Sequence, residues 1–95
     1  MSTVIVTYDL DRGWGEVAAR LREQGFYKVL QTKAGPRRAP NTTVFIDDLK
    51  PADAAVRFDA ALARANGDLG QPIKIRKRFI ATVDDGWYLW SDEAA

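Results

Sequence analysis

The stretch TVIVTYDL, at Thr3–Leu10, decides the fold that we expect for this chain. It is mostly apolar and rich in β-branched residues, which is typical of a strand in the middle of a sheet. Its two alternating sets of side chains are Val4, Val6, Tyr8 and Leu10 on one face, and Thr3, Ile5, Thr7 and Asp9 on the other. Because neighbouring strand residues point to opposite faces, we expect the first set to face the core and the second an open face.

Helical periodicity comes next along the chain. Apolar residues recur at i, i+3, i+4 and i+7 from Trp14 to Leu21, and Gly25 is a typical residue to follow a helix end. A second amphipathic helix is expected from Pro51 until Asn66-Gly67 ends it.

Three further strands are expected, over residues 26–32, 41–47 and 73–83, because these segments are rich in β-formers. Residues 33–40 contain glycine and prolines and predict a wide hairpin loop. A tight turn over residues 84–86 is expected to lead into a short terminal strand. The order predicts an α+β, ferredoxin-like βαββαβ fold with a short extra C-terminal strand. Both helices are then expected on one face of an antiparallel sheet, in a single domain over residues 1–95.

Length and composition limit the functions to consider. The chain has 95 residues, with neither cysteine nor histidine, which excludes disulfides, Cys/His zinc sites, thiol nucleophiles and imidazole bases. A chain this short builds only a small core, so we expect a homodimer. The N-terminus shows no signal-peptide pattern and no apolar stretch is long enough to span a bilayer, which predicts a cytoplasmic protein without a membrane partner.

Positive charge is unevenly placed although the net charge is only +1. Lys74, Arg76 and Arg78 alternate along the last long strand, about 6.5 to 7 Å apart, which is close to the spacing of phosphates along a nucleic-acid strand. We expect this stripe on the open face, with Arg37 and Arg38 at a hairpin tip as further phosphate contacts. The alternative is that these cations are solvated and prevent edge pairing.

Asp9 is the candidate for metal chemistry because it ends an otherwise apolar central strand. One interpretation is a Mg²⁺ ligand, with a twofold axis that brings two Asp9 carboxylates together. The other is an acid that starts the turn into the first helix, with Asp11 as the helix cap.

Aromatic residues gather near the C-terminus, at Trp87, Tyr88 and Trp90. A short strand with two tryptophans cannot bury both on its own domain, so we expect them at a dimer interface. A stacking surface for bases is the alternative.

The Tyr8-Asp9 ending of the first strand, Gln31 and the segment Thr43-Val-Phe-Ile-Asp47 resemble the second CRISPR-associated protein family and its virulence-associated protein D relatives. This resemblance implies a ferredoxin-like endoribonuclease or nucleic-acid-binding dimer, in which Asp9 is the metal-binding aspartate at the dimer cleft. The sequence departs from the family in its long hairpin segment and in having Ile46 where the family has glutamate.

The sequence therefore leaves two main hypotheses for the function. The first is a dimeric protein that binds RNA or DNA, with Asp9 of each subunit holding Mg²⁺ for cleavage of phosphodiesters. The second is a non-enzymatic dimeric binding module of the same fold. A small-molecule sensor is a third possibility, and it requires an apolar pocket that the sequence does not display.

Overall fold

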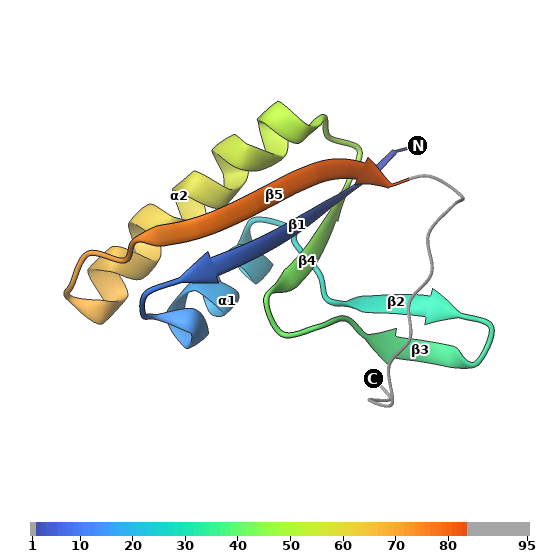
Figure 1. The fold of residues 1–95 in the computed structure, drawn as a ribbon, viewed down its shortest axis with the longest axis horizontal. Coiled ribbons are helices and arrows are strands. Elements are labelled where there is room, and N and C mark those ends of the chain that lie inside the picture. The colour runs from blue at the N-terminus through green and yellow to red at the C-terminus, as the bar shows by residue number, and fades with distance from the viewer. Residues whose placement is uncertain (1, 84–95) are drawn as a thin grey trace.

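Strand β1, at Thr3–Leu10, is the centre of a three-stranded antiparallel sheet in the computed structural model, which describes residues 2–83. Its neighbours are β4, at Thr43–Asp47, and β5, at Ile75–Val83, so the strand order is β4-β1-β5. Figure 1 shows β1 running between the other two. The prediction of a central first strand is confirmed.

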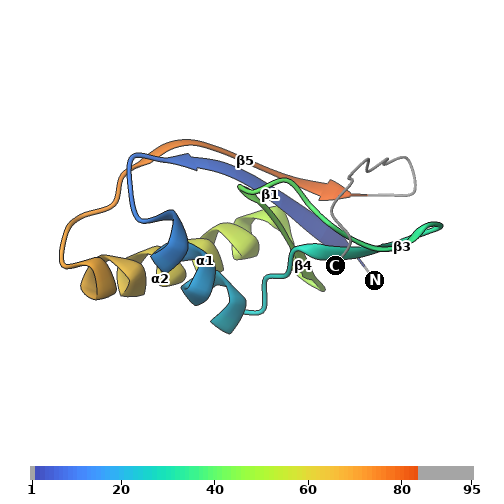
Figure 2. The same cartoon turned by 90° about the horizontal axis from the view of Figure 1, so that it is seen from below.

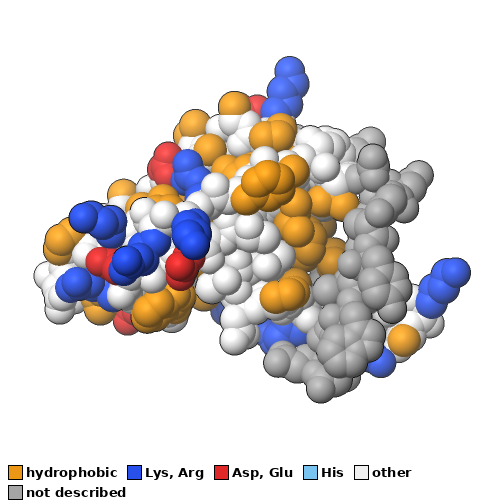
Figure 3. All heavy atoms as spheres, in the orientation of Figure 1, with side chains coloured by type: hydrophobic (Ala, Val, Ile, Leu, Met, Phe, Trp, Pro, Cys, Tyr) orange, Lys and Arg blue, Asp and Glu red, His pale blue; other side chains and the backbone are white. Residues whose placement is uncertain are grey.

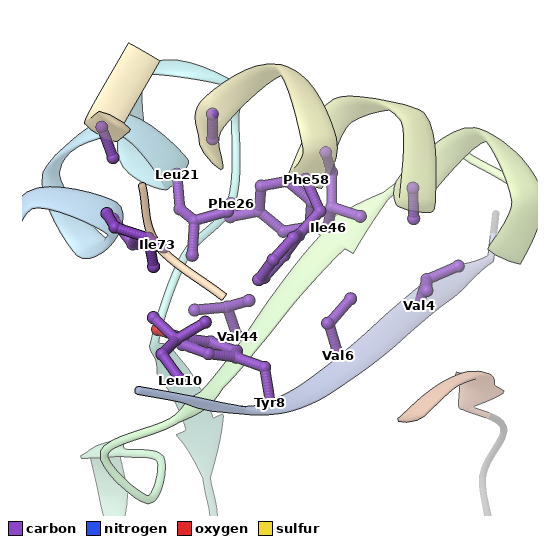
Figure 4. Packing of buried hydrophobic residues seen from close by; sticks show 14 residues of the cluster. Val4, Val6, Tyr8, Leu10, Leu21, Phe26, Val44, Ile46, Phe58 and Ile73 are labelled. Carbon is purple, nitrogen blue, oxygen red and sulfur yellow. The ribbon is translucent and has the colours of Figure 1, made fainter. Parts of the chain in front are cut away.

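The two faces of β1 differ as the alternation predicted. Val4 and Val6 are fully buried, and Tyr8 and Leu10 nearly so. Thr3, Ile5 and Thr7 are half-buried, and Asp9 is exposed. Both helices lie on the first of these faces (Figure 2). The resulting core is centred on Phe58, whose ring meets those of Tyr8 and Phe26 edge-on at centroid distances of 5.1 and 6.4 Å (Figure 4).

Helix α1, at Trp14–Glu23, buries Val17 and Leu21 and is followed by Gly25, as expected. It begins at Trp14, where the apolar stripe was predicted to start, but its cap is not the one considered. Gly13 is the N-terminal cap residue, in a left-handed conformation with φ 76°, and no side chain caps the helix. Asp11 is therefore not a helix cap. Its carboxylate instead accepts a hydrogen bond from the backbone N–H of Lys74, at 2.9 Å.

The segment expected as a wide loop contains a strand. Strand β2, at Val29–Thr32, pairs with β3, at Gly35–Arg38, in a two-stranded hairpin that extends away from the three-stranded sheet (Figure 1). Pro36 is tolerated because a two-stranded hairpin leaves each strand one edge where a missing N–H breaks no ladder bond. Thr32 tightens the turn, since its hydroxyl donates to the carbonyl of Gly35 at 2.6 Å.

The strand expected over residues 26–32 is divided in two. Its beginning contacts the outer edge of β4, where Tyr27 and Phe45 exchange two backbone hydrogen bonds of 2.8 Å and their rings stack. Its remainder is β2. This bridge, together with the hydrogen bond from the Tyr27 hydroxyl to Asp47 at 2.7 Å, attaches the hairpin to the main sheet.

Helix α2, at Pro51–Leu69, runs past the predicted stop at Asn66-Gly67 and ends at Gly70, where φ is 72°. Glycine in a helix interior costs about 1 kcal/mol relative to alanine. The extra turn places Leu69 against the core, and Asn66 accepts the backbone N–H of Ile73 at 2.9 Å instead of capping the helix.

Strand β5 departs from the predicted alternation. Leu10 lies opposite Ile75 and Asp9 opposite Lys77, so Arg76 is an extra residue in a β-bulge. Beyond the bulge, Arg78 and Ile80 lie opposite Tyr8 and Val6 and share their helix-covered face. The prediction that Lys74, Arg76 and Arg78 form one stripe on the open face is therefore wrong. Ile75 and Ile80 both pack on the core although five positions apart, so strict alternation cannot hold between them.

Candidate nucleic-acid interface

The bulge in β5 lies beside the end of β1, and two hydrogen bonds fix this junction. The backbone N–H of Asp11 donates to the carbonyl of Lys74 at 3.1 Å, and the Asp11 carboxylate accepts the Lys74 N–H. This second bond, ahead of the charge of Arg12, lowers the pKa of Asp11 below its usual value. Asp11 is thus ionised near neutral pH and holds the start of β5 in place.

Three cations lie at this junction or just after it in the sequence, Lys74, Arg76 and Lys77, and we name them the β5 basic cluster. All three are exposed, and none forms an ion pair with an acid of residues 2–83. The neighbouring Arg12 differs, because it contacts Asp11 at 3.4 Å and Gln71 at 2.5 Å. Figure 3 shows blue side chains gathered at the end of the molecule where β5 starts, with red side chains between them.

Arg78, which was predicted to bind nucleic acid, has structural partners. Its guanidinium bonds Asp59 of α2 at 2.7 Å and lies 5.3 Å from the centre of the buried Phe58 ring. Its side chain is 24% exposed. Arg78 therefore connects the edge strand to the helix layer.

Asp9 is exposed on the open face, directly opposite Lys77 of β5. The two belong to a shallow hollow of about 340 Å³, which Thr7, Tyr8, Arg78 and Phe79 also line. Within residues 2–83, no three acidic side chains come together as a metal site. A lysine at the cross-strand position next to Asp9 also opposes a divalent cation there, since such neighbours have Cβ atoms about 5 Å apart.

Arg37 and Arg38 lie on β3, in the hairpin strand itself rather than at its tip, which is formed by Lys33 and Ala34. Figure 1 shows the hairpin and the start of β5 at opposite ends of a molecule that is 41 Å long. One copy of the chain therefore carries two separate basic regions rather than one continuous surface.

A second hollow, of about 320 Å³, lies between α1 and the hairpin, with Leu21, Phe26 and Val44 among its lining. It bears on the sensor hypothesis because its size is at the lower end for ligand pockets. Lys28, on its rim, already donates to the carbonyls of Pro40, Asn41 and Thr43. That ammonium group therefore serves the loop before β4.

The residues predicted from sequence divide into three groups. Lys74 and Arg76 lie together, Arg78 points to the other face, and Arg37 and Arg38 lie far away. Trp87, Tyr88 and Trp90 lie outside the described residues, as do the expected turn and terminal strand. Lys77 was missed as an open-face cation. The five-position interval between Ile75 and Ile80 is the signal that points to it.

A scan of the chain against protein-family models found no match, and searches of the curated proteins and of the solved structures found none either. No helix within residues 2–83 is long and apolar enough to cross a membrane.

Proposed function

We propose that this chain is a dimeric nucleic-acid-binding protein that holds the phosphate backbone on the β5 basic cluster. The observation that carries the proposal is the exposure of Lys74, Arg76 and Lys77 without acidic partners in the described part of the chain. Each such cation releases condensed counterions when it contacts a phosphate, which favours binding without reading sequence.

The fold proposed with this function is ferredoxin-like. Two observations support it: the order β4-β1-β5 with both helices on one face, and the bridge that adds the Tyr27 segment outside β4. The Tyr8-Asp9 motif supports a relation to the second CRISPR-associated protein family and its virulence-associated protein D relatives, within which binding of RNA or DNA is expected.

The test is retention of a fluorescent single-stranded RNA, a single-stranded DNA and a duplex at 20 to 300 mM salt. With three phosphate contacts, we expect the logarithm of affinity to fall with the logarithm of salt at a slope of about −2 on single strands. The double variant Lys74→Glu with Lys77→Glu should abolish binding. A steep sequence dependence, or affinity insensitive to salt, would contradict the proposal.

The matched control is Lys50→Glu with Arg64→Glu. Both residues are exposed cations outside the basic cluster, Lys50 as the N-cap residue of α2 and Arg64 within the helix, and the change in net charge is identical. If this variant loses affinity as much as the first, the binding reflects net charge alone and the site is wrongly placed.

Cleavage of the bound strand is a second candidate, and one observation favours it. Asp9 is an exposed acid at the end of a buried central strand, and it lines a shallow hollow. A Mg²⁺ ion held there would polarise a phosphate and activate water. A single carboxylate is a thin site for magnesium, so this proposal requires Asp9 from two subunits on one axis.

The decisive comparison is cleavage by wild type and by Asp9→Asn, with and without EDTA. Asp9→Asn keeps the side-chain shape and removes the charge that holds the cation. Cleavage that is lost in the Asp9→Asn variant, and lost from wild type when EDTA is added, supports the site. Cleavage that survives the substitution or EDTA assigns the activity elsewhere, and binding without cleavage leaves the non-enzymatic module.

A further inference from the structure

The outer edge of β5 differs along its length, and the difference suggests a binding surface. No other strand lies beside this edge within residues 2–83. An unpaired edge is usually protected by charged residues, bulges or proline. The first part of β5 has the bulge at Arg76 and the cations up to Arg78, whereas Phe79–Val83, FIATV in sequence, has neither charge, bulge nor proline. We name this second part the open edge.

The hydrogen bonds of β1 show which backbone groups of β5 point outward at the open edge. The N–H of Tyr8 donates to Thr42, beside β4, so the backbone groups of Thr7 and Ile5 point to β5. Their partners Phe79 and Ala81 therefore point back to β1. Ile80 and Thr82 are left with N–H and C=O groups directed outward.

Apolar side chains border the open edge on both faces of the sheet. Phe79, on the open face, is 64% exposed. Ile80, on the helix-covered face, is partly buried and packs against the core. Orange side chains lie over this part of β5 in Figure 3.

We propose that the open edge binds the open edge of a second copy of this chain, antiparallel, with Ala81 of both copies next to the twofold axis. Ile80 and Thr82 then exchange backbone hydrogen bonds with the partner's Thr82 and the partner's Ile80. Phe79 packs across from the partner's Val83, an aromatic and β-branched pair of the kind that stabilises sheets. The two sheets become one of six strands.

The distribution of charge favours a second copy as the occupant and favours antiparallel pairing of the two strands. In the antiparallel arrangement, the two Arg78 residues lie on opposite sides of the axis, about 20 Å apart along the strands, so the protected parts do not repel. A parallel pair would place the cations of both copies side by side. A strand pair of five residues is small against the roughly 1,600 Å² that stable interfaces bury, and the exposed ring of Phe79 supplies further apolar area.

This inference specifies the homodimer of the proposed function, and it separates the two Asp9 carboxylates. Asp9 lies opposite Lys77, four residues from the axis, so the two are about 26 Å apart along the strands. A shared magnesium ion therefore needs a different interface, and the two basic clusters lie at opposite ends of a common sheet.

The first test is amide hydrogen exchange of the full chain at low and high protein concentration, without nucleic acid. The N–H groups of Ile80 and Thr82 should gain protection as concentration rises, whereas those of Phe79 and Ala81 are protected at both because they bond β1. Equal behaviour of the two pairs overturns the proposal.

The second test is sedimentation equilibrium of variants. Thr82→Pro removes one outward donor, and we expect dimerisation to weaken by at least about 100-fold. Phe79→Lys serves where Thr82→Pro does not fold, and should act in the same direction. Thr7→Lys, on the open face one strand inward and opposite Phe79, should weaken the dimer much less than Phe79→Lys does.

Other results each count against this interface. A dimer that resists Thr82→Pro and dissociates with Thr7→Lys joins the open faces instead. A monomer at 100 µM excludes a second copy as the occupant and favours the terminal strand that the sequence predicts after the turn over residues 84–86. Nucleic-acid retention is measured separately, so loss of the dimer with intact retention refutes this inference alone.

Discussion

The two parts of β5 share one strand and one neighbour, yet their side chains have opposite characters. Ile75–Arg78 carries three cations and a bulge, and Phe79–Val83 carries none of either. The first part suits a phosphate backbone, and the second suits another strand. The bulge is what allows both, because it turns Lys77 to the open face and Arg78 to the helices without disturbing the pairing on either side.

Phe58 supports the point where the two parts meet, so its truncation should have the largest effect. The ring is fully buried against Tyr8 and Phe26, under the guanidinium of Arg78. Phe58→Ala should lower the free energy of unfolding by about 3 to 5 kcal/mol, as for other buried aromatics. Urea denaturation measures it. If the free energy of unfolding falls by less than about 1 kcal/mol, the point where the two parts of β5 meet does not depend on packing against Phe58.

Deletions test whether Arg76 is the extra residue. Without Arg76, Lys77 follows Ile75 directly and both keep their partners on β1, so the ladder becomes regular. Deleting Phe79 instead turns either Arg78 or Ile80 to the wrong face. We expect the second deletion to destabilise the chain more, by on the order of 2 kcal/mol. Equal losses in thermal and urea unfolding would place the irregularity elsewhere.

The neighbouring arginines should separate stability from binding. Arg78→Ala loses a partly exposed ion pair and a cation–π contact, about 1 kcal/mol together, whereas Arg76→Ala should change stability by less than about 0.5 kcal/mol. For nucleic-acid affinity the order is reversed, and Arg76→Ala should lower it more than Arg78→Ala does. A double-mutant cycle with Asp59→Ala isolates the ion pair. If Arg78→Ala weakens retention more than Arg76→Ala, the assignment of the two roles is reversed.

The sequence predicted what depends on local pattern. The alternation of β1 predicted its buried side chains, which are Val4, Val6, Tyr8 and Leu10. Gly25 was predicted to follow the end of α1, and it does. It misplaced Arg78 because a bulge depends on pairing with β1, which no single strand reveals. It ended α2 too early because packing of Leu69 outweighs the cost of Gly67. Within the candidate site, Lys74 and Arg76 were found, and Lys77 was missed for the same reason that Arg78 was misplaced.

The smallest expected effect concerns the junction that starts the basic part of β5. The hydrogen bond from the Lys74 N–H lowers the pKa of Asp11 in the folded chain. A lowered folded pKa gives a contribution to stability that is present above the unfolded pKa, about 3.9, and is lost as pH falls through the folded value. The Asp11→Asn variant keeps an acceptor oxygen and does not titrate. Its urea midpoint, relative to wild type, should therefore improve slightly between pH 5 and pH 3. Asp68, whose pKa Arg20 lowers, titrates in both proteins and cancels in the difference. A difference that is flat with pH would show that the Asp11 charge does not help to hold β5 at Lys74.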